Sequence, residues 1–136
     1  MELLALLVSS FLAATVLPLA SELPLAVVIR RHGDYLLPVT IATLGNYLGA
    51  CTTYGLARAA AARLTSPRTA SPPPRALVLF ERYGAPALLL SWIPVIGDAI
   101  VAMAGASRVR VLPFSMWTIA GKAARYAVVA WVVLNV

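Results

Sequence analysis

Apolar residues form four segments along this chain, and two of these segments are interrupted near their middle. Residues 35–57 and 111–136 are continuous, and about 20 apolar residues are enough to cross a hydrocarbon core about 30 Å thick. Residues 3–29 and 80–106 are instead broken by prolines, glycines and single acidic residues. Each arm of a broken segment, at roughly 9 to 15 residues, reaches only about 14 to 22 Å as a helix. The pattern therefore predicts two membrane-crossing helices and two helical hairpins that turn back near the middle of the bilayer.

The two halves of the chain share one spacing of special residues. A single offset of 76 residues relates four pairs of positions: Pro18 and Pro94, Glu22 and Asp98, Gly45 and Gly121, and Asn46 and Lys122. This spacing predicts a duplicated unit, in which a re-entrant helical hairpin is followed by a transmembrane helix. One hairpin plus one crossing gives each unit an odd number of crossings, so the two repeats have inverted topologies. We expect an all-α integral membrane protein with one domain over residues 1–136, made of repeat 1 (1–57), a linker (58–79) and repeat 2 (80–136).

The composition supports a membrane setting. Hydrophobic residues make up 61% of the 136 residues and charged residues only 12%, with a mean hydropathy of +0.87, whereas soluble domains carry about 25% charged residues. The net charge is +6, but the arginines flank apolar segments and form no basic face with interleaved aromatics, which argues against nucleic acid as a partner. Cys51 and His32 are each alone and match no metal-site spacing, and no nucleophile–base signature is present. We therefore expect no enzyme activity, no metal and no other cofactor.

Residues 1–20 have the hydropathy of a signal peptide, but their charge does not fit one. A signal peptide begins with a basic region, whereas this segment carries Glu2 and no lysine or arginine. The apolar pattern also resumes after Glu22. We expect residues 1–20 to be a structural part of the mature protein.

The distribution of arginines indicates whether the two broken segments cross the membrane or turn back within it. If all four apolar segments crossed the membrane, four arginines would face five, and neither orientation would be favoured. If the broken segments turn back, seven arginines share the side of the linker: Arg58, Arg63, Arg68, Arg75, Arg82, Arg108 and Arg110. Only Arg30 and Arg31 then lie on the other side. This positive-inside bias favours the hairpins, with the linker 58–79 in the cytoplasm and both termini across the membrane.

Ionisable residues inside apolar segments are the first candidates for function, because a charge within the bilayer is costly. Glu22 and Asp98 are the candidates for binding and releasing protons. Lys122 and Arg125 fall on one helical face together with Gly121. A cation at a helix centre costs about 2.5 to 3.5 kcal/mol on insertion scales, so we expect both cations to face the protein interior and to attract an anion.

The equivalent face of the first half is small and polar. Asn46 lies there with Gly45 and Gly49, a small-xxx-small pair typical of close helix packing. We assign anion binding to Lys122, Arg125 and Asn46, and hairpin breaks or close packing to Pro18, Pro94, Gly97, Gly45, Gly49 and Gly121. Two structural alternatives stay open: an ion pair of Glu22 with Lys122 or of Asp98 with Arg125, and a hydrogen-bonding strut at Asn46.

Five stretches resemble one known family. They are Leu17–Glu22, Thr43–Asn46, Phe80–Gly84, Ser91–Asp98 and Gly121–Tyr126, which read LPLASE, TLGN, FERYG, SWIPVIGD and GKAARY. These stretches resemble the YqaA branch of the DedA superfamily, which includes the SNARE-associated Golgi or VTT-domain proteins. The resemblance covers nearly the whole chain, and the motif of the second half is the more specific one.

The resemblance implies a multi-pass protein of the bacterial inner membrane with two re-entrant hairpins and a role in moving lipids or in membrane homeostasis. The usual DedA pattern has one arginine three residues before the hairpin proline and another three residues after it. This chain has Ser91 and Gly97 at those positions. Lys122 and Arg125 are the candidates to replace the two cations.

The function that we expect is proton-coupled translocation of a lipid or of an anionic lipid headgroup, with membrane lipids and protons as partners. A small-ion transporter or channel and a non-transporting membrane scaffold are the alternatives. A chain of 14.4 kDa is also compatible with a homodimer, because one copy has few helices with which to shield two charged hairpin tips from lipid.

Overall fold

The computed structural model describes residues 1–15, 22–63, 74–93 and 95–136, and in these ranges all regular structure is helical. The elements are α1 (Glu2–Thr15), α2 (Glu22–His32), α3 (Leu36–Arg63), α4 (Pro74–Tyr83), the 3₁₀ helix η1 (Ala85–Trp92), α5 (Ile96–Ala106) and α6 (Val111–Asn135). The all-α class expected from the sequence is confirmed for the described residues. Pro18 and Pro94, two of the expected hairpin breaks, lie outside them.

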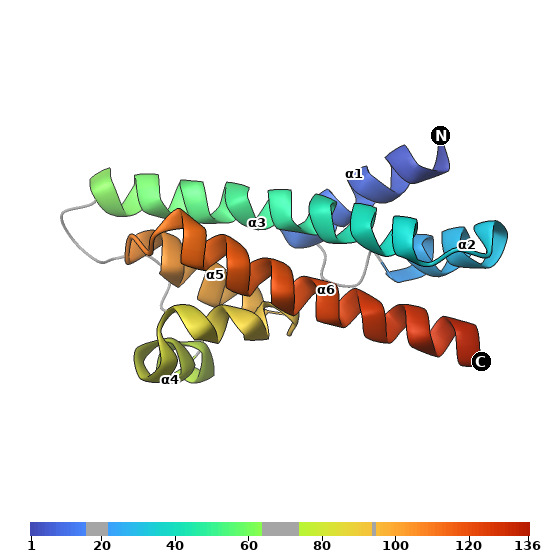
Figure 1. The fold of residues 1–136 in the computed structure, drawn as a ribbon. Helices are drawn as coiled ribbons and strands as arrows, with labels where there is room; N and C mark the ends of the chain where they lie inside the picture. The colour runs from blue at the N-terminus through green and yellow to red at the C-terminus, as the bar shows by residue number, and fades with distance from the viewer. Residues whose placement is uncertain (16–21, 64–73, 94) are drawn as a thin grey trace.

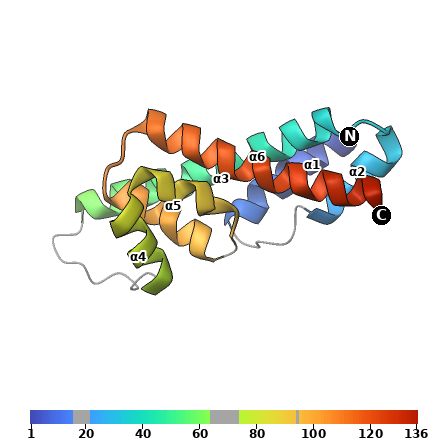
Figure 2. The ribbon, with the colours of Figure 1, turned by 60° about the horizontal axis from the view of Figure 1, so that its bottom comes forward.

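The two long helices, α3 and α6, lie side by side and run in opposite directions (Figures 1 and 2). Helices α1 and α2 occupy the end of the bundle where both termini lie, and η1 and α5 occupy the opposite end (Figure 1). In Figure 2, α4 projects from this second end, crosswise to the long helices. Among the main packing contacts, α1 packs on α3 and η1 on α6, whereas α2 packs on α6 and α5 on α3. Exchanging the two halves of the chain therefore leaves this set of helix contacts unchanged.

Two boundaries expected from the sequence need correction. Helix α3 continues to Arg63 instead of ending at residue 57, because Ala59–Ala62 favour helix strongly; residues 74–79, assigned to the linker, belong to α4. Within the described ranges, no helix is both long enough and apolar enough to cross a membrane, so the crossings expected for residues 35–57 and 111–136 are not confirmed. Both long helices carry polar side chains near their midpoints, Asn46 in α3 and Lys122 in α6.

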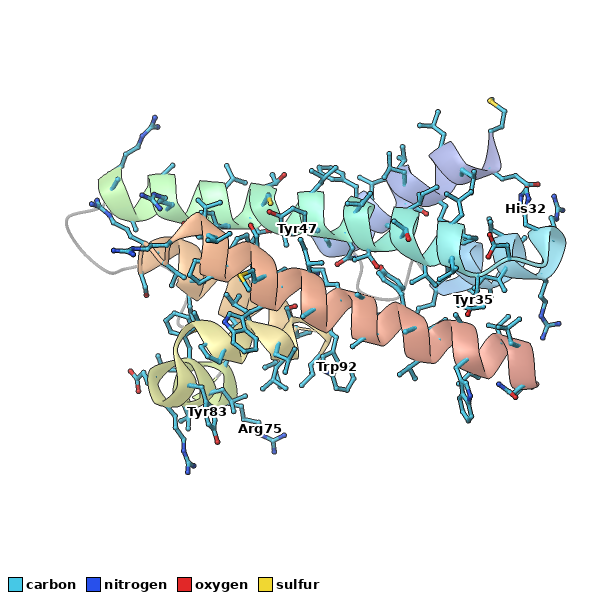
Figure 3. All side chains as sticks on the ribbon, viewed as in Figure 1. His32, Tyr35, Tyr47, Arg75, Tyr83 and Trp92 are labelled. Atoms are coloured by element: carbon cyan, nitrogen blue, oxygen red, sulfur yellow. The ribbon has the colours of Figure 1, made fainter. Side chains whose placement is uncertain are left out.

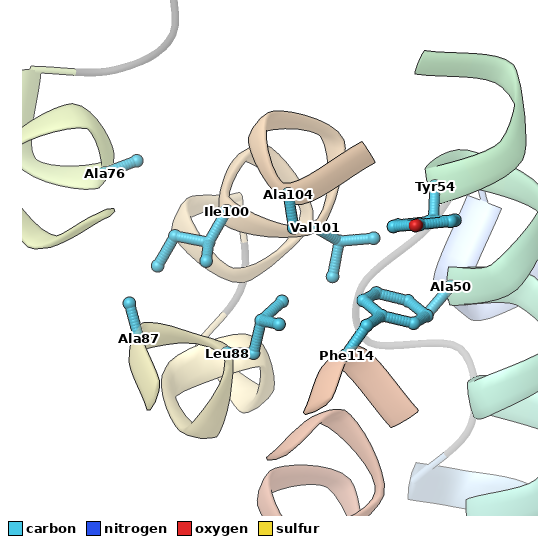
Figure 4. Close-up of a cluster of buried hydrophobic side chains, with 9 residues drawn as sticks. All are labelled: Ala50, Tyr54, Ala76, Ala87, Leu88, Ile100, Val101, Ala104 and Phe114. Carbon is cyan, nitrogen blue, oxygen red and sulfur yellow. The ribbon is translucent and has the colours of Figure 1, made fainter. Parts of the chain in front are cut away.

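Buried apolar side chains form two clusters. The first consists of Ala50, Tyr54, Ala76, Ala87, Leu88, Ile100, Val101, Ala104 and Phe114 (Figure 4). The second consists of Leu6, Leu25, Val28, Ile29, Ala42, Tyr126 and Ala130. Asn46 lies between Ala42 and Ala50 along α3, and Lys122 lies between Phe114 and Tyr126 along α6. A polar layer therefore separates the two apolar clusters.

The outward side chains are mostly large and apolar. Side chains that are about half exposed or more include Leu4, Val8, Leu12, Leu44, Leu48, Leu112, Met116, Val128 and Leu134. The outward polar and aromatic side chains labelled in Figure 3 include His32 and Tyr35 at the end with the termini and Arg75 and Tyr83 on α4, whereas Trp92 lies near the middle. A soluble monomer rarely exposes apolar patches of such extent, so the outer surface is one that suits an apolar environment.

Glycines set how closely the helices approach. A Cβ atom on Gly45 would lie 2.5 Å from the Leu7 carbonyl oxygen of α1, and one on Gly49 would lie 2.5 Å from the Ala14 Cβ. On α6, a Cβ on Gly121 would overlap the carbonyl oxygen of Leu89 in η1. Each long helix therefore holds the backbone of a short helix against a glycine, at the two positions that the 76-residue offset relates.

This packing predicts opposite effects for two glycine substitutions in the same helix. Gly45→Ala should lower the free energy of unfolding by about 1 to 3 kcal/mol, because the added methyl group meets backbone that cannot move aside. Gly55→Ala meets nothing within 4 Å and should raise stability by about 0.5 to 1 kcal/mol, because alanine favours helix over glycine. Unfolding of both variants in detergent micelles, compared with the parent protein, measures the two effects. Equal effects at the two positions would contradict the packing.

Candidate functional site

A small polar cavity lies in the layer between the two apolar clusters. Its lining comes from both halves of the chain: Ala13, Ala14, Asn46, Ser91, Ile93, Asp98, Lys122 and Arg125. The cavity has a volume of about 10 Å³, which is close to the space that one water molecule needs. Four of the five residues assigned to proton coupling or anion binding therefore line one cavity. The fifth, Glu22, contacts Arg125.

The centre of this site is a contact between equivalent positions of the two halves. The Lys122 side chain is almost fully buried, with Lys122 only 3% exposed, and its Nζ donates a hydrogen bond to Oδ1 of Asn46, 76 residues earlier. The Asn46 Nδ2 in turn donates to the backbone carbonyl of Ser10 in α1 at 3.1 Å. A buried ammonium group needs such an acceptor because burial removes its water. Asn46 therefore connects α1, α3 and α6 through one side chain.

An ion pair joins the first hairpin to the last helix. Glu22 is the first residue of α2, and its Oε1 lies 2.5 Å from Nη2 of Arg125 in α6. The Nη1 of Arg125 also donates to the carbonyl oxygen of Trp92, at the end of η1, over 3.3 Å. The sequence left open whether Glu22 pairs with Lys122; the structure pairs it with Arg125. Arg125 thus contacts both the first residue of α2 and the last residue of η1.

The second carboxylate has a different environment. Asp98 lies in the first turn of α5, where the positive end of the helix dipole favours a negative charge. No hydrogen bond or ion pair joins its carboxylate to any residue in the described part of the chain, so the alternative of an Asp98–Arg125 ion pair is not what the structure contains. Lys122 and Arg125 are still near enough to act on its charge, and all three residues line the cavity. Asp98 is therefore the carboxylate that lines the cavity without a direct partner among the described residues.

Buried hydroxyl groups near the site lack hydrogen-bond partners within the described ranges: Ser10, Ser91 and Thr118. Ser91 matters most, because it is only 4% exposed and lines the cavity. An unsatisfied buried hydroxyl costs about 1 to 3 kcal/mol, and such a group in a cavity calls for a water molecule or a ligand. The sequence identified Ser91 only as a replacement for an arginine. That replacement by a small polar residue was the available signal for a ligand-facing position.

The backbone around Ser91 is unusual in two ways. The helix η1 that carries Ser91 is a 3₁₀ helix of 8 residues, and 3₁₀ runs longer than 3 to 4 residues are uncommon. Val95, three residues before Asp98, has a φ of 66°, which a β-branched residue rarely adopts. Gly97 fits here because a Cβ would overlap the backbone of Ser91. The tip of the second hairpin is therefore tightly folded around the cavity.

The comparisons with known proteins place the chain among membrane proteins. The VTT domain family matches residues 23–134. The inner membrane protein YqaA of Escherichia coli is 40% identical over 131 residues, which cover 96% of this chain and 89% of the relative, and YqaA of Shigella flexneri matches equally well. A Haemophilus influenzae protein described as uncharacterized is 42% identical over 130 residues, which cover 88% of this chain and 79% of the relative. No solved structure gives a significant match.

The Lys122–Asn46 contact predicts non-additive effects on stability. Asn46→Ala should lower the free energy of unfolding by about 2 to 3 kcal/mol, because it leaves a buried ammonium group without its acceptor. Adding Lys122→Met should restore most of that loss, because replacing both partners of a buried polar pair is far milder than removing one. A double-mutant cycle in detergent measures the coupling. Asn135→Ala, at the exposed end of α6, is the matched control and should change stability by less than about 0.5 kcal/mol.

Proposed function

This chain belongs to the VTT-domain family, in the YqaA branch of the DedA superfamily, and from that premise we propose that it moves a lipid with an anionic headgroup across the bacterial inner membrane, coupled to protons. It is a DedA-family membrane protein, and its named relatives are inner membrane proteins. The observation that carries the proposal is the polar cavity, because it joins two cations and a carboxylate inside an otherwise apolar bundle.

The bundle inserts into the bilayer as a packed unit, with α3 and α6 along the membrane normal. The hairpins α1–α2 and η1–α5 then enter from opposite faces and turn back near the midplane, as expected of inverted repeats. Two features support this topology: the hairpins lie at opposite ends of the bundle, and the main helix contacts are unchanged when the halves are exchanged. Non-helical backbone at such depth is tolerated only when protein or a wet cavity shields it.

The linker end of the bundle faces the cytoplasm. In the described part of the chain, this end carries Arg58, Arg63, Arg75, Arg82, Arg108 and Arg110, whereas the other end carries Arg30 and Arg31. Arg31 and His32 are moreover held by Glu2, whose pKa the Arg31 guanidinium lowers. The excess of free positive charge thus lies at the linker end, in keeping with the positive-inside rule.

The headgroup binds at Lys122, with help from Ser91 and Arg125. The Lys122 ammonium has three donors, of which Asn46 takes one, and the Ser91 hydroxyl donates to no described acceptor. A phosphate oxygen that enters the cavity accepts hydrogen bonds from both. Charge-assisted hydrogen bonds of this kind are roughly twice as strong as neutral ones. Asp98 and Glu22 are the two candidate groups for the protons that accompany the headgroup.

The cavity in this structure has room for about one oxygen atom rather than a whole headgroup. Entry of a headgroup therefore requires a hairpin tip to move away from α6. The Glu22–Arg125 ion pair and the Arg125–Trp92 hydrogen bond are the contacts that hold the two tips in place. The small volume also favours the second candidate function, transport of a small ion, for which no such movement is needed.

Reconstitution tests this function. Purified protein in phosphatidylcholine vesicles should move fluorescently labelled phosphatidylglycerol between leaflets, as measured by the fraction that dithionite quenches. Lys122→Met should slow this movement about 10- to 100-fold, because it removes a charge-assisted hydrogen bond of about 1.5 to 3 kcal/mol. Glu22→Gln together with Asp98→Asn should abolish its dependence on pH. Glu81→Gln, an exposed acidic residue on α4, is the matched control and should match the parent protein.

Three results would contradict the proposal. Unchanged lipid movement and unchanged pH dependence in the Glu22→Gln and Asp98→Asn variants, at normal protein levels, would exclude the proton mechanism. Ion flux without lipid movement would indicate the small-ion transporter. Variants that change only folding or abundance would indicate a scaffold.

A further inference from the structure

The charges around the cavity cancel. Lys122 and Arg125 contribute two positive charges, and Glu22 and Asp98 contribute two negative charges. We propose that the empty site is electrically neutral, that each monoanionic phosphate group therefore enters with one proton on Asp98, and that transport is electroneutral. This inference rests on the proposed function and specifies its stoichiometry.

The geometry assigns the proton to Asp98 rather than to Glu22. The Glu22 carboxylate is held by the Arg125 guanidinium at 2.5 Å, and a proton on Glu22 would leave that cation without its partner carboxylate. Asp98 has no hydrogen bond or ion pair with a described residue, and it lines the same cavity as Lys122. An anion bound at Lys122 adds a second negative charge beside Asp98. Protonation of Asp98 removes this repulsion, because a like charge disfavours the ionised form of a carboxyl group.

The surroundings of Asp98 leave this charge count intact. Helix α5 has no other ionisable residue, and η1 has none. From α3, the titratable groups that pack near α5 are Tyr47, Cys51 and Tyr54, which are neutral when protonated. From α4, the ionisable residues Arg75, Glu81, Arg82 and Tyr83 are all exposed. From α6, the only charged residues are Lys122 and Arg125.

The alternative is a site that carries the anion without a proton. Such a site would move one negative charge across the membrane in each cycle. Moving one charge through 100 mV is worth about 2.3 kcal/mol, which shifts the equilibrium distribution of the lipid about 50-fold. A proton–anion pair carries no net charge, so the equilibrium distribution of the lipid between the leaflets does not depend on the membrane potential. It follows the proton gradient instead, with about a tenfold shift for each pH unit.

The experiment imposes the two gradients separately on vesicles that contain the parent protein and labelled phosphatidylglycerol. A potassium gradient with valinomycin sets a potential of about 100 mV at equal pH, and a buffer jump of one pH unit sets a proton gradient at zero potential. The readout is the steady-state ratio of label in the outer leaflet to label in the inner leaflet. We expect about a tenfold shift with the pH gradient and no shift with the potential. A shift of about 50-fold with the potential, or none with pH, overturns the inference.

A variant sharpens the test. Asp98→Asn removes the proton site, so the residual lipid movement should lose its response to pH and gain the response to potential. Glu81→Gln removes an acidic group far from the cavity and should behave as the parent protein does. If Asp98→Asn fails to fold or to move lipid, the two gradient experiments on the parent protein still test whether transport is electroneutral.

The outcomes separate this inference from the function on which it rests. Lipid movement that follows the membrane potential contradicts electroneutrality and leaves lipid translocation standing. Absence of any lipid movement contradicts the proposed function. A parallel measurement of inorganic phosphate uptake into the same vesicles distinguishes a lipid headgroup from free phosphate as the source of the anion. Phosphate uptake without lipid movement contradicts the proposed function, and the same two gradients applied to phosphate then test the charge balance.

Discussion

The arrangement of this protein depends on burying the ammonium group of Lys122 in the middle of an apolar bundle. A buried charge needs an acceptor, and Asn46 supplies one from the equivalent position of the other half. That contact fixes the distance between α3 and α6. It also explains why the short helices meet glycines at Gly45 and Gly121: the residue next to each partner must be small for α1 and η1 to close over the pair. The polar layer and the close helix packing are thus two consequences of one constraint.

The two halves share their helix contacts but not their charges. Both cations of the polar layer belong to α6, and the positions on α3 that the 76-residue offset relates to them are Asn46 and Gly49. Glu22 must therefore cross to the other half to find a cation, whereas Asp98 lies in its own half beside one. The two halves pack alike but differ in charge. Glu22 therefore forms a structural ion pair with Arg125, whereas Asp98 lines the cavity. If the two halves were fully symmetric, the two carboxylates would have the same surroundings.

The sequence predicted the elements well and the contacts in part. The offset of 76 residues identified Asn46 and Lys122 as equivalent, because spacing along a chain survives folding. The offset did not predict that Asn46 and Lys122 form a hydrogen bond. Two residues related by a repeat contact each other only when both lie close to the axis that relates the two repeats. The second apolar segment was expected to end at residue 57, because Arg58 and Arg63 made residues 58–63 look like a polar linker. The alanines between them favour helix strongly, and α3 therefore continues to Arg63. Ser91 was missed as a cavity residue because a lone serine gains meaning only from the groups that surround it.

The unsatisfied hydroxyl of Ser91 connects stability to function. A site that exists only to hold the bundle together would place an apolar side chain there, because an unpaired buried hydroxyl costs about 1 to 3 kcal/mol. The strained φ of Val95 and the long 3₁₀ helix beside it add further cost at the same tip. Such local destabilisation is tolerated where a ligand can offset it, and in the proposed mechanism a phosphate oxygen between Ser91 and Lys122 accepts hydrogen bonds from both donors. The site beside Ser91 therefore has an unused donor, and under the proposed function the oxygen of an anionic ligand is the group that accepts its hydrogen bond.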